Sequence, residues 1–143
     1  MGKIVTTALL YSALVFGAGL LLGPIRALLI EPLLGPVAAT LCEAPIMIAV
    51  TVFAAWWTPR VTGLNRQAIA LVLVGVIALV FQQAADLAVD VLLRGISVTG
   101  VFVHFATPEG AIYGILLALF AAMPWLLVFL GRGVRSLIPR ARS

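Results

Sequence analysis

Four long apolar stretches, each the length of a membrane-spanning helix, constrain this chain more than any other feature. A helix needs about 20 mostly apolar residues to cross the hydrocarbon core, at about 1.5 Å of rise per residue. The chain of 143 residues is 64% hydrophobic and only 10% charged, whereas an average soluble domain carries about 25% charged residues. The sequence therefore predicts an all-α fold, an integral membrane four-helix bundle with the lipid bilayer as its solvent. The expected spans are Ile4 to about Leu22, about Val37 to Trp57, about Ala68 to Leu92 and about Ala111 to Leu130.

Glycine and proline mark the expected ends of the first two spans. Gly-Pro pairs at 23–24 and 35–36 bracket the first connection. The Thr-Pro-Arg sequence at 58–60 is expected to stop the second helix, because a proline cannot donate the next backbone hydrogen bond.

The last two spans have capping residues at their starts. Asn65 is the expected N-cap of the third helix, and Thr107 that of the fourth, with Pro108 at its first helical position. The apolar stretch 95–106 is too short to span and is predicted to form a short outer-side loop between the third and fourth helices.

The basic residues are unevenly divided between the two ends of the predicted bundle. Arg26 and Arg94 fall at one end, and seven others fall at the opposite end: Lys3, Arg60, Arg66, Arg132, Arg135, Arg140 and Arg142. Short loops rich in Lys and Arg stay in the cytoplasm. The pattern predicts a multi-pass membrane protein with both termini cytoplasmic, a single transmembrane domain over 1–131 and a basic cytoplasmic tail over 132–143. Three tryptophans also lie toward the predicted cytoplasmic interface, where indole rings are enriched: Trp56, Trp57 and Trp125.

Polar side chains collect in the outer half of the predicted bundle. Glu43 lies seven residues into the second helix, roughly 10 Å deep, and Arg26 follows the first span. The third helix carries a series spaced by four residues, which places its members on one helical face: Gln82, Asp86, Asp90 and Arg94. A charge at depth costs several kcal/mol unless it is paired or hydrated, so we expect Arg26 or Arg94 to reach Glu43.

Three roles are open for Glu43: a structural ion pair, a proton or transport site, or another binding role. Pro45 follows it and removes a backbone N–H, which frees a carbonyl that needs a partner or a cavity. Asp90 and Arg94 suit a simple i,i+4 pair, and Asp86 lies close enough to the interface for water to solvate it. An interhelical hydrogen bond is the expected role of Gln82.

Small residues indicate where helices pack closely. Gly19 and Gly23, just before Pro24, form a G-x-x-x-G spacing, which is expected to serve packing within the bundle or self-dimerisation. Cys42 is the single cysteine and is expected to fill core space. His104 is the single histidine, so no histidine pair exists for a metal site.

The sequence gives no positive indication of enzymatic activity. It has no phosphate-binding loop, no histidine pair suited to haem and no nucleophile motif. Nor does it have the basic face with readout residues that a nucleic-acid partner would need. We expect a protein that is not an enzyme, with no cofactor and no metal.

Three runs carry a resemblance to a known family: FGAGLLLGPIRALLIEPLLG, LCEAPIMI and AIYGILLALFAAMPWLL. They resemble an uncharacterised family of small four-span bacterial inner-membrane proteins, which implies a fold and a location but no activity. The leading functional hypothesis is an accessory subunit or small homo-oligomer, with a membrane-protein partner or self-association. The alternative is a proton- or ion-coupled small transporter that uses Glu43.

Overall fold

The computed structural model is a bundle of four long helices. It describes residues 1–64, 67–92, 95, 97, 99, 100, 103 and 106–137, with the backbone alone for 131–137. Its elements are α1 (Gly2–Ile25), the π-helical segment η1 (Arg26–Ile30), α2 (Glu31–Leu34), α3 (Pro36–Val61), α4 (Ala68–Leu92) and α6 (Pro108–Leu137). Four helical segments are long and apolar enough to cross a membrane. The predicted all-α membrane bundle is thus confirmed. Several predicted features lie outside the described residues: the N-cap Asn65, Arg66, Arg94, His104, Arg140 and Arg142.

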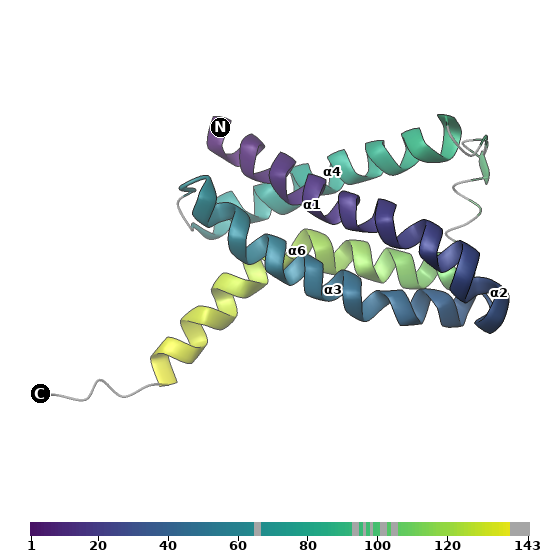
Figure 1. The fold of residues 1–143 in the computed structure, drawn as a ribbon. Helices are drawn as coiled ribbons and strands as arrows, with labels where there is room; N and C mark the ends of the chain where they lie inside the picture. Colours follow the sequence, from purple (N-terminus) through teal and green to yellow (C-terminus); the bar gives the residue numbers. More distant parts are fainter. Residues whose placement is uncertain are drawn as a thin grey trace, which may run out of the picture.

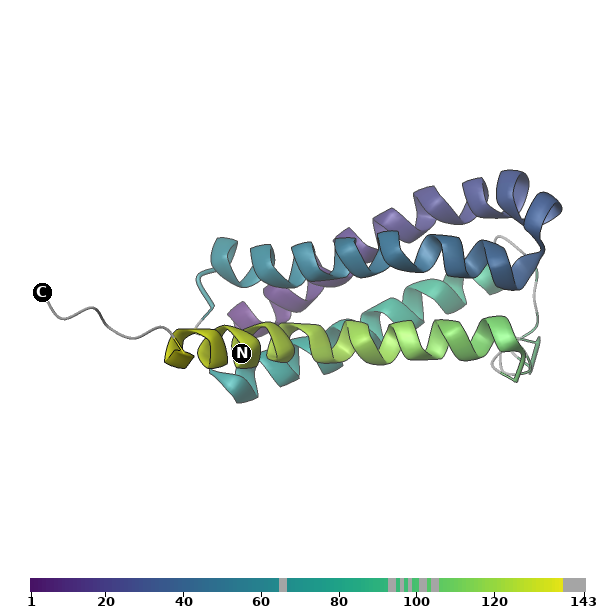
Figure 2. The ribbon, with the colours of Figure 1, turned by 90° about the horizontal axis from the view of Figure 1, so that it is seen from below.

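The four long helices form two layers around a shared core (Figures 1 and 2). α1 packs against α3 and α4, and α6 packs against the same two helices. α1 and α6 therefore occupy opposite corners of the bundle. The N-terminus and the C-terminal end of α6 lie at one end of the molecule (Figure 1). We call this the N-terminal end; the opposite end, which holds α2, the end of α4 and the start of α6, is the α2 end.

The first helix does not stop at the Gly-Pro pair, and the prediction of a connection from 23 onward is wrong. Pro24 lies inside α1, which passes into the π-helical segment η1 and then into α2 without leaving helical geometry. Pro24 lacks only the N–H that would bond the carbonyl of Leu20. A π-helical turn, with its wider i→i+5 bonding, is a known way of absorbing a local defect in a membrane helix. The real turn falls at Gly35, whose φ of 81° suits glycine.

The second predicted helix also runs past its expected stop. α3 includes Pro59 and ends at Val61. The N–H of Leu64 donates to the carbonyl of Pro59 at 3.0 Å, and the N–H of Gly63 donates to Arg60 at 3.4 Å. Gly63 has a φ of 61°. This is a Schellman ending, so the glycine rather than the proline sets the end of the helix.

The start of α6 agrees with the sequence. Pro108 is its first residue, and the Thr107 hydroxyl accepts a hydrogen bond from the N–H of Gly110 at 3.1 Å. The predicted N-cap is confirmed. The helix continues to Leu137, past the predicted end of the span at Leu130, and its final part turns away from the bundle (yellow in Figure 1). Pro124 lies within α6, and proline is a common cause of such a bend.

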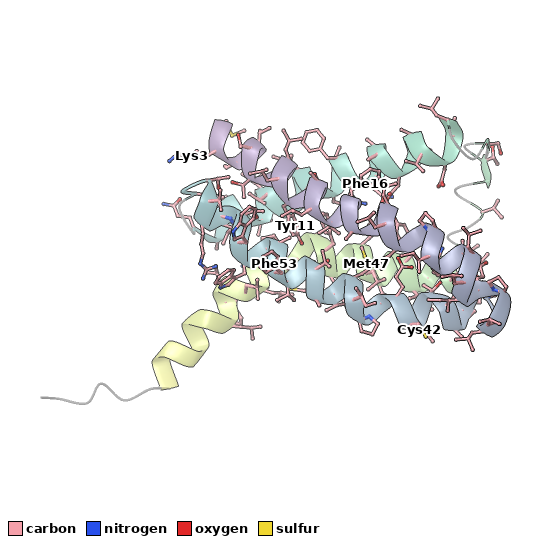
Figure 3. The ribbon with its side chains drawn as sticks, in the orientation of Figure 1. Lys3, Tyr11, Phe16, Cys42, Met47 and Phe53 are labelled. Atoms are coloured by element: carbon pink, nitrogen blue, oxygen red, sulfur yellow. The ribbon has the colours of Figure 1, made fainter. Side chains whose placement is uncertain are left out.

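The core lies in the middle of the bundle and joins the two diagonal helices. The rings of Tyr11 and Phe120 stack with their centroids 4.5 Å apart, and the Tyr11 hydroxyl donates to the carbonyl of Phe120 at 2.7 Å. Tyr11 is fully buried and lies centrally in Figure 3. Small residues surround this pair, including Ala8, Ala54 and Ala78. This packing closes the middle of the bundle.

Close contacts also hold the N-terminal end together. The hydroxyls of Thr7 and Thr62 lie 2.6 Å apart, and the Lys3 ammonium donates to the carbonyl of Gly63 at 3.3 Å. These contacts bind the start of α1 to the end of α3. At the α2 end the helices instead leave a cavity between them, and this cavity is the candidate site.

The outer surface of the bundle is rich in exposed leucine, isoleucine, valine and aromatic side chains, as a lipid-facing surface requires. Cys42 belongs to this surface, pointing away from the bundle in Figure 3. The expectation that it fills the core is wrong, because its position on α3 faces outward.

Candidate functional site

A cavity of about 450 Å³ lies in the half of the bundle toward the α2 end. All four long helices line it. Along α6 its lining extends from Glu109 near the helix start to Phe120 and Met123 in the core, about 16 Å from Glu109 to Phe120 by helical rise. At core depth its inner end is lined by Val15, Thr51, Phe120 and Met123. We call this space the polar cavity.

One wall of the polar cavity carries an ion pair between α1 and α3. Arg26, the first residue of η1, places its Nε 3.4 Å from Glu43 Oε2. Its Nη1 donates to the Thr40 hydroxyl at 2.9 Å, and that hydroxyl donates to the carbonyl of Pro36. The side chain of Arg26 is 29% exposed and that of Glu43 is 16% exposed. The pair is only partly desolvated and lies where the chain passes from α-helical to π-helical geometry.

The opposite wall is a hydrogen-bonded group on α4 and α6. The Gln82 amide nitrogen donates to both carboxylate oxygens of Asp86, at 3.3 Å each. The Tyr113 hydroxyl, from α6, donates to the same carboxylate and lies 3.3 Å from Gln83 Oε1. Asp86 therefore receives donors from two helices. The expectation of an interhelical bond for Gln82 is wrong: its amide bonds within α4, because Asp86 lies one turn ahead on the same face.

Glycines give the polar cavity part of its width. Gly19 and Gly23 line it on the α1 side. A Cβ atom at Gly23 would meet nothing within 4 Å, and one at Gly19 would meet only the end of Met47 at 3.8 Å. The sequence predicted that the G-x-x-x-G pair would serve close packing within the bundle or self-dimerisation. Within the bundle the two glycines do not pack closely against another helix; they border open space.

The structure brings together most of the residues that the sequence singled out. Arg26, Glu43, Gln82, Asp86 and Asp90 all line the polar cavity. Arg94 lies outside the described residues, so its expected pairing with Asp90 or Glu43 stays a prediction. Pro24 and Pro45 lie inside helices beside the cavity.

Five polar lining residues were not among the site residues predicted from the sequence: Thr40, Thr51, Gln83, Glu109 and Tyr113. Thr40 and Tyr113 sit in apolar runs where a hydroxyl is usually unremarkable, and Glu109 reads as an ordinary first-turn acid. The spacing of Thr40 could have indicated its role, because Thr40 precedes Glu43 by three residues and therefore lies on the same helical face. Tyr113 carried no such signal, since only packing of α6 on α4 places it beside Asp86.

The polar cavity combines mostly apolar walls with a few convergent polar groups. Its charged groups among the described residues are one guanidinium, of Arg26, and the carboxylates of Glu43, Asp86, Asp90 and Glu109. Within the described part of the chain, no three His, Cys, Asp or Glu side chains gather closely enough to hold a metal ion. This geometry suits a small organic molecule better than a bare cation.

Comparison of the chain with protein-family models, with curated proteins and with solved structures finds no match. The resemblance to a family of small four-span proteins therefore stays an expectation. The site has to be interpreted from its own geometry.

Proposed function

We propose that this multi-pass membrane protein binds a small organic molecule in the polar cavity. The single observation that carries this proposal is the cavity itself, a partly open space of about 450 Å³ lined by four helices. Ligand sites typically occupy 300–1,000 Å³, have mainly apolar walls with a few placed polar groups, and occur between the helices of bundles. Of the three roles open for Glu43, a binding role fits best.

The polar groups around the cavity support a binding role more than a purely structural one. The Arg26–Glu43 pair joins η1 to α3 along a wall of the cavity, and Gly19 and Gly23 of α1 place no side chain in the part of the wall that they form. A chain selected only for packing gains stability by filling such space.

The test is a substitution that fills the cavity without disturbing the helices. Gly19→Leu projects a side chain into the polar cavity, and its Cβ meets only an ordinary contact. Gly17→Leu is the matched control, because Gly17 lies two residues away, has nothing within 4 Å of its Cβ and does not line the cavity. Both variants are expected to fold.

The probes are small molecules that share a phenethyl body and differ in their head group: phenethylamine, phenethyl alcohol, trimethylphenethylammonium and phenylpropionate. Binding to protein in lipid nanodiscs is measured by calorimetry. We expect at least one probe to bind wild type and Gly17→Leu, and to lose binding in Gly19→Leu. If no probe binds, or if Gly19→Leu binds like wild type, the proposal is wrong.

A second candidate function is proton- or ion-coupled transport with Glu43 as the carrier group. The observation that favours it is the helix irregularity beside the site: Pro24 and the π-helical segment η1 directly adjoin Arg26, the partner of Glu43. π-helical segments are frequent at functional sites, and prolines are a common cause of kinks in helices. Transport requires the Tyr11–Phe120 pair to open toward the N-terminal end.

Transport is tested with proteoliposomes. Uptake of a probe that binds should depend on an ion gradient and disappear in Glu43→Gln while probe binding persists. Binding without any gradient-driven uptake would exclude transport and leave the binding function standing.

The accessory-subunit or small homo-oligomer hypothesis and the bacterial inner-membrane location stay predictions. Purification from native membranes in mild detergent, with identification of the proteins that co-purify, tests the first. A ligand in the polar cavity is compatible with either assembly state.

A further inference from the structure

Two buried polar atoms of described residues that line the polar cavity have no hydrogen-bond partner: Arg26 Nε, which faces Glu43 Oε2 in the ion pair, and Gln82 Oε1. Gln82 lines the cavity, is 7% exposed, and its Oε1 is buried and unbonded. Its amide nitrogen is committed to Asp86. A flip of the amide would turn its oxygen toward that carboxylate, so Oε1 must serve as the acceptor. Leaving a buried acceptor unsatisfied costs about 1–3 kcal/mol, which makes this atom a place for an external donor.

The surroundings of Gln82 define the charge that this donor should carry. Asp86 lies beside the Gln82 amide, and Glu43 belongs to the wall of α1 and α3. Carboxylates in a partly desolvated site repel an anionic head group and attract a cation. Arg26, the one described cation of the lining, is already held by Glu43 and Thr40.

The rest of the lining defines the body of the ligand. Leu116, Leu117 and Phe120 of α6 line the cavity with other apolar side chains from α1, α3 and α4. A fully hydrated metal ion would leave these side chains against water. An apolar body would bury them, at about 25 cal/mol for each Å² removed from water.

We infer that the ligand of the polar cavity is an amphipathic protonated amine, whose ammonium N–H groups donate to Gln82 Oε1 near Asp86 and whose apolar body packs against Leu116, Leu117 and Phe120. This inference rests on the proposed binding function and adds the chemical class of the ligand. Both features of the head group matter: positive charge suits the carboxylates, and an N–H donor satisfies the orphaned acceptor.

The phenethyl probes separate these two features, because they share one apolar body. Phenethylamine carries charge and donors, trimethylphenethylammonium carries charge without donors, phenethyl alcohol carries one donor without charge, and phenylpropionate carries the opposite charge. A hydrogen bond to a charged group contributes about 1.5–3 kcal/mol, so we expect phenethylamine to bind wild type at least about tenfold more tightly than each of the others. Nanodiscs without protein correct for partition into lipid.

Gln82→Leu tests the acceptor directly. It removes Oε1 and keeps a side chain of similar size, but it also removes the Nε2 donor to Asp86, so some loss of thermal stability is expected and binding is measured below the unfolding temperature of the variant. We expect this variant to bind phenethylamine about as weakly as trimethylphenethylammonium. Gly19→Leu should abolish binding of both amines, and Gly17→Leu should preserve the full ranking of probes.

The outcomes separate this inference from the proposed function. If phenethyl alcohol or phenylpropionate binds as tightly as phenethylamine, and Gly19→Leu removes that binding, the cavity binds ligands but the amine assignment is overturned. The same holds if Gln82→Leu leaves the preference for phenethylamine intact. If no probe binds in a way that depends on Gly19, the inference and the proposed function both fail.

Discussion

At the scale of single residues, the polar side chains of the membrane-spanning part are held in small groups that each join two helices. Arg26 meets Glu43 across α1 and α3, and Tyr113 meets Asp86 across α6 and α4. A charged group in a span is tolerated when it faces the bundle interior and finds a partner or water. The polar cavity supplies both conditions for Glu43, which lies within the membrane-spanning helix α3 and is paired with Arg26.

The Arg26–Glu43 contact makes a quantitative prediction for a double-mutant cycle. Glu43→Gln and Arg26→Gln should each lower the free energy of unfolding, and the double variant should lose less than the sum of the two. Because both side chains are partly exposed, we expect a coupling energy of about 0.5–3 kcal/mol, the range for residues in contact. Unfolding in mixed micelles measures it.

Strictly additive losses in that cycle would count against the contact. Leu21→Ala is a suitable control in the same helix, since Leu21 is 72% exposed on the lipid-facing side. It should show no coupling to Glu43→Gln.

At the scale of helices, small residues decide how close two elements approach. Gly75 of α4 lies against the backbone of Ala121 in α6, where an added Cβ would come within 1.9 Å of the Ala121 carbonyl oxygen. Such close approach is typical of small residues at membrane helix interfaces. The predicted G-x-x-x-G at Gly19 and Gly23 instead borders empty space, so the close contact of this fold comes from a glycine outside any spaced motif.

Gly75→Ala should therefore push α4 and α6 apart. We expect a loss of about 1–3 kcal/mol or more in the free energy of unfolding, as for other overpacked sites, measured by thermal unfolding in detergent. Gly114→Ala in α6 is the matched control, because its Cβ would meet nothing within 4 Å. It should be neutral or stabilising by up to about 1 kcal/mol, the helix-propensity difference. Equal effects of the two variants would contradict the observed contact.

At the scale of the whole molecule, the bundle has two unlike halves. The N-terminal half is closed by the Tyr11–Phe120 pair and by the contacts of Lys3 and Thr7 with the end of α3. The half toward the α2 end contains the polar cavity. Any molecule that reaches Glu43 or Gln82 in this structure therefore enters from the α2 end or from the lipid beside it.

The distribution of basic residues predicts which compartment each half faces. Reporter fusions after residue 143 and within the 58–66 loop should both read cytoplasmic, because positively charged short loops remain on that side. The C-terminal end of α6 lies at the same end of the molecule as the N-terminus (Figure 1), where Lys3 contacts Gly63, so we expect the two fusions to agree with each other whatever the orientation. A periplasmic signal from both would reverse the orientation, and the polar cavity would then open toward the cytoplasm.

The sequence by itself determined the helical class, the four spans and the residues that carry charge into them. Length and hydropathy suffice for this, because a chain in lipid must satisfy its backbone hydrogen bonds within each helix. The Thr107 cap was also readable, since it depends on neighbouring residues alone. The continuation of the first helix through Pro24 could not be predicted, because a π-helical turn has no distinct sequence pattern.

Only the tertiary structure decided what the polar residues do together. Arg26 and Glu43 are 17 positions apart, and Tyr113 and Asp86 are 27 apart; the packing of α1 on α3 and of α6 on α4 makes them neighbours. The unbonded oxygen of Gln82 and the space beside Gly19 are likewise properties of the assembled bundle. A sequence fixes which groups are present, but the distances between helices fix which groups remain unsatisfied and where a ligand has room.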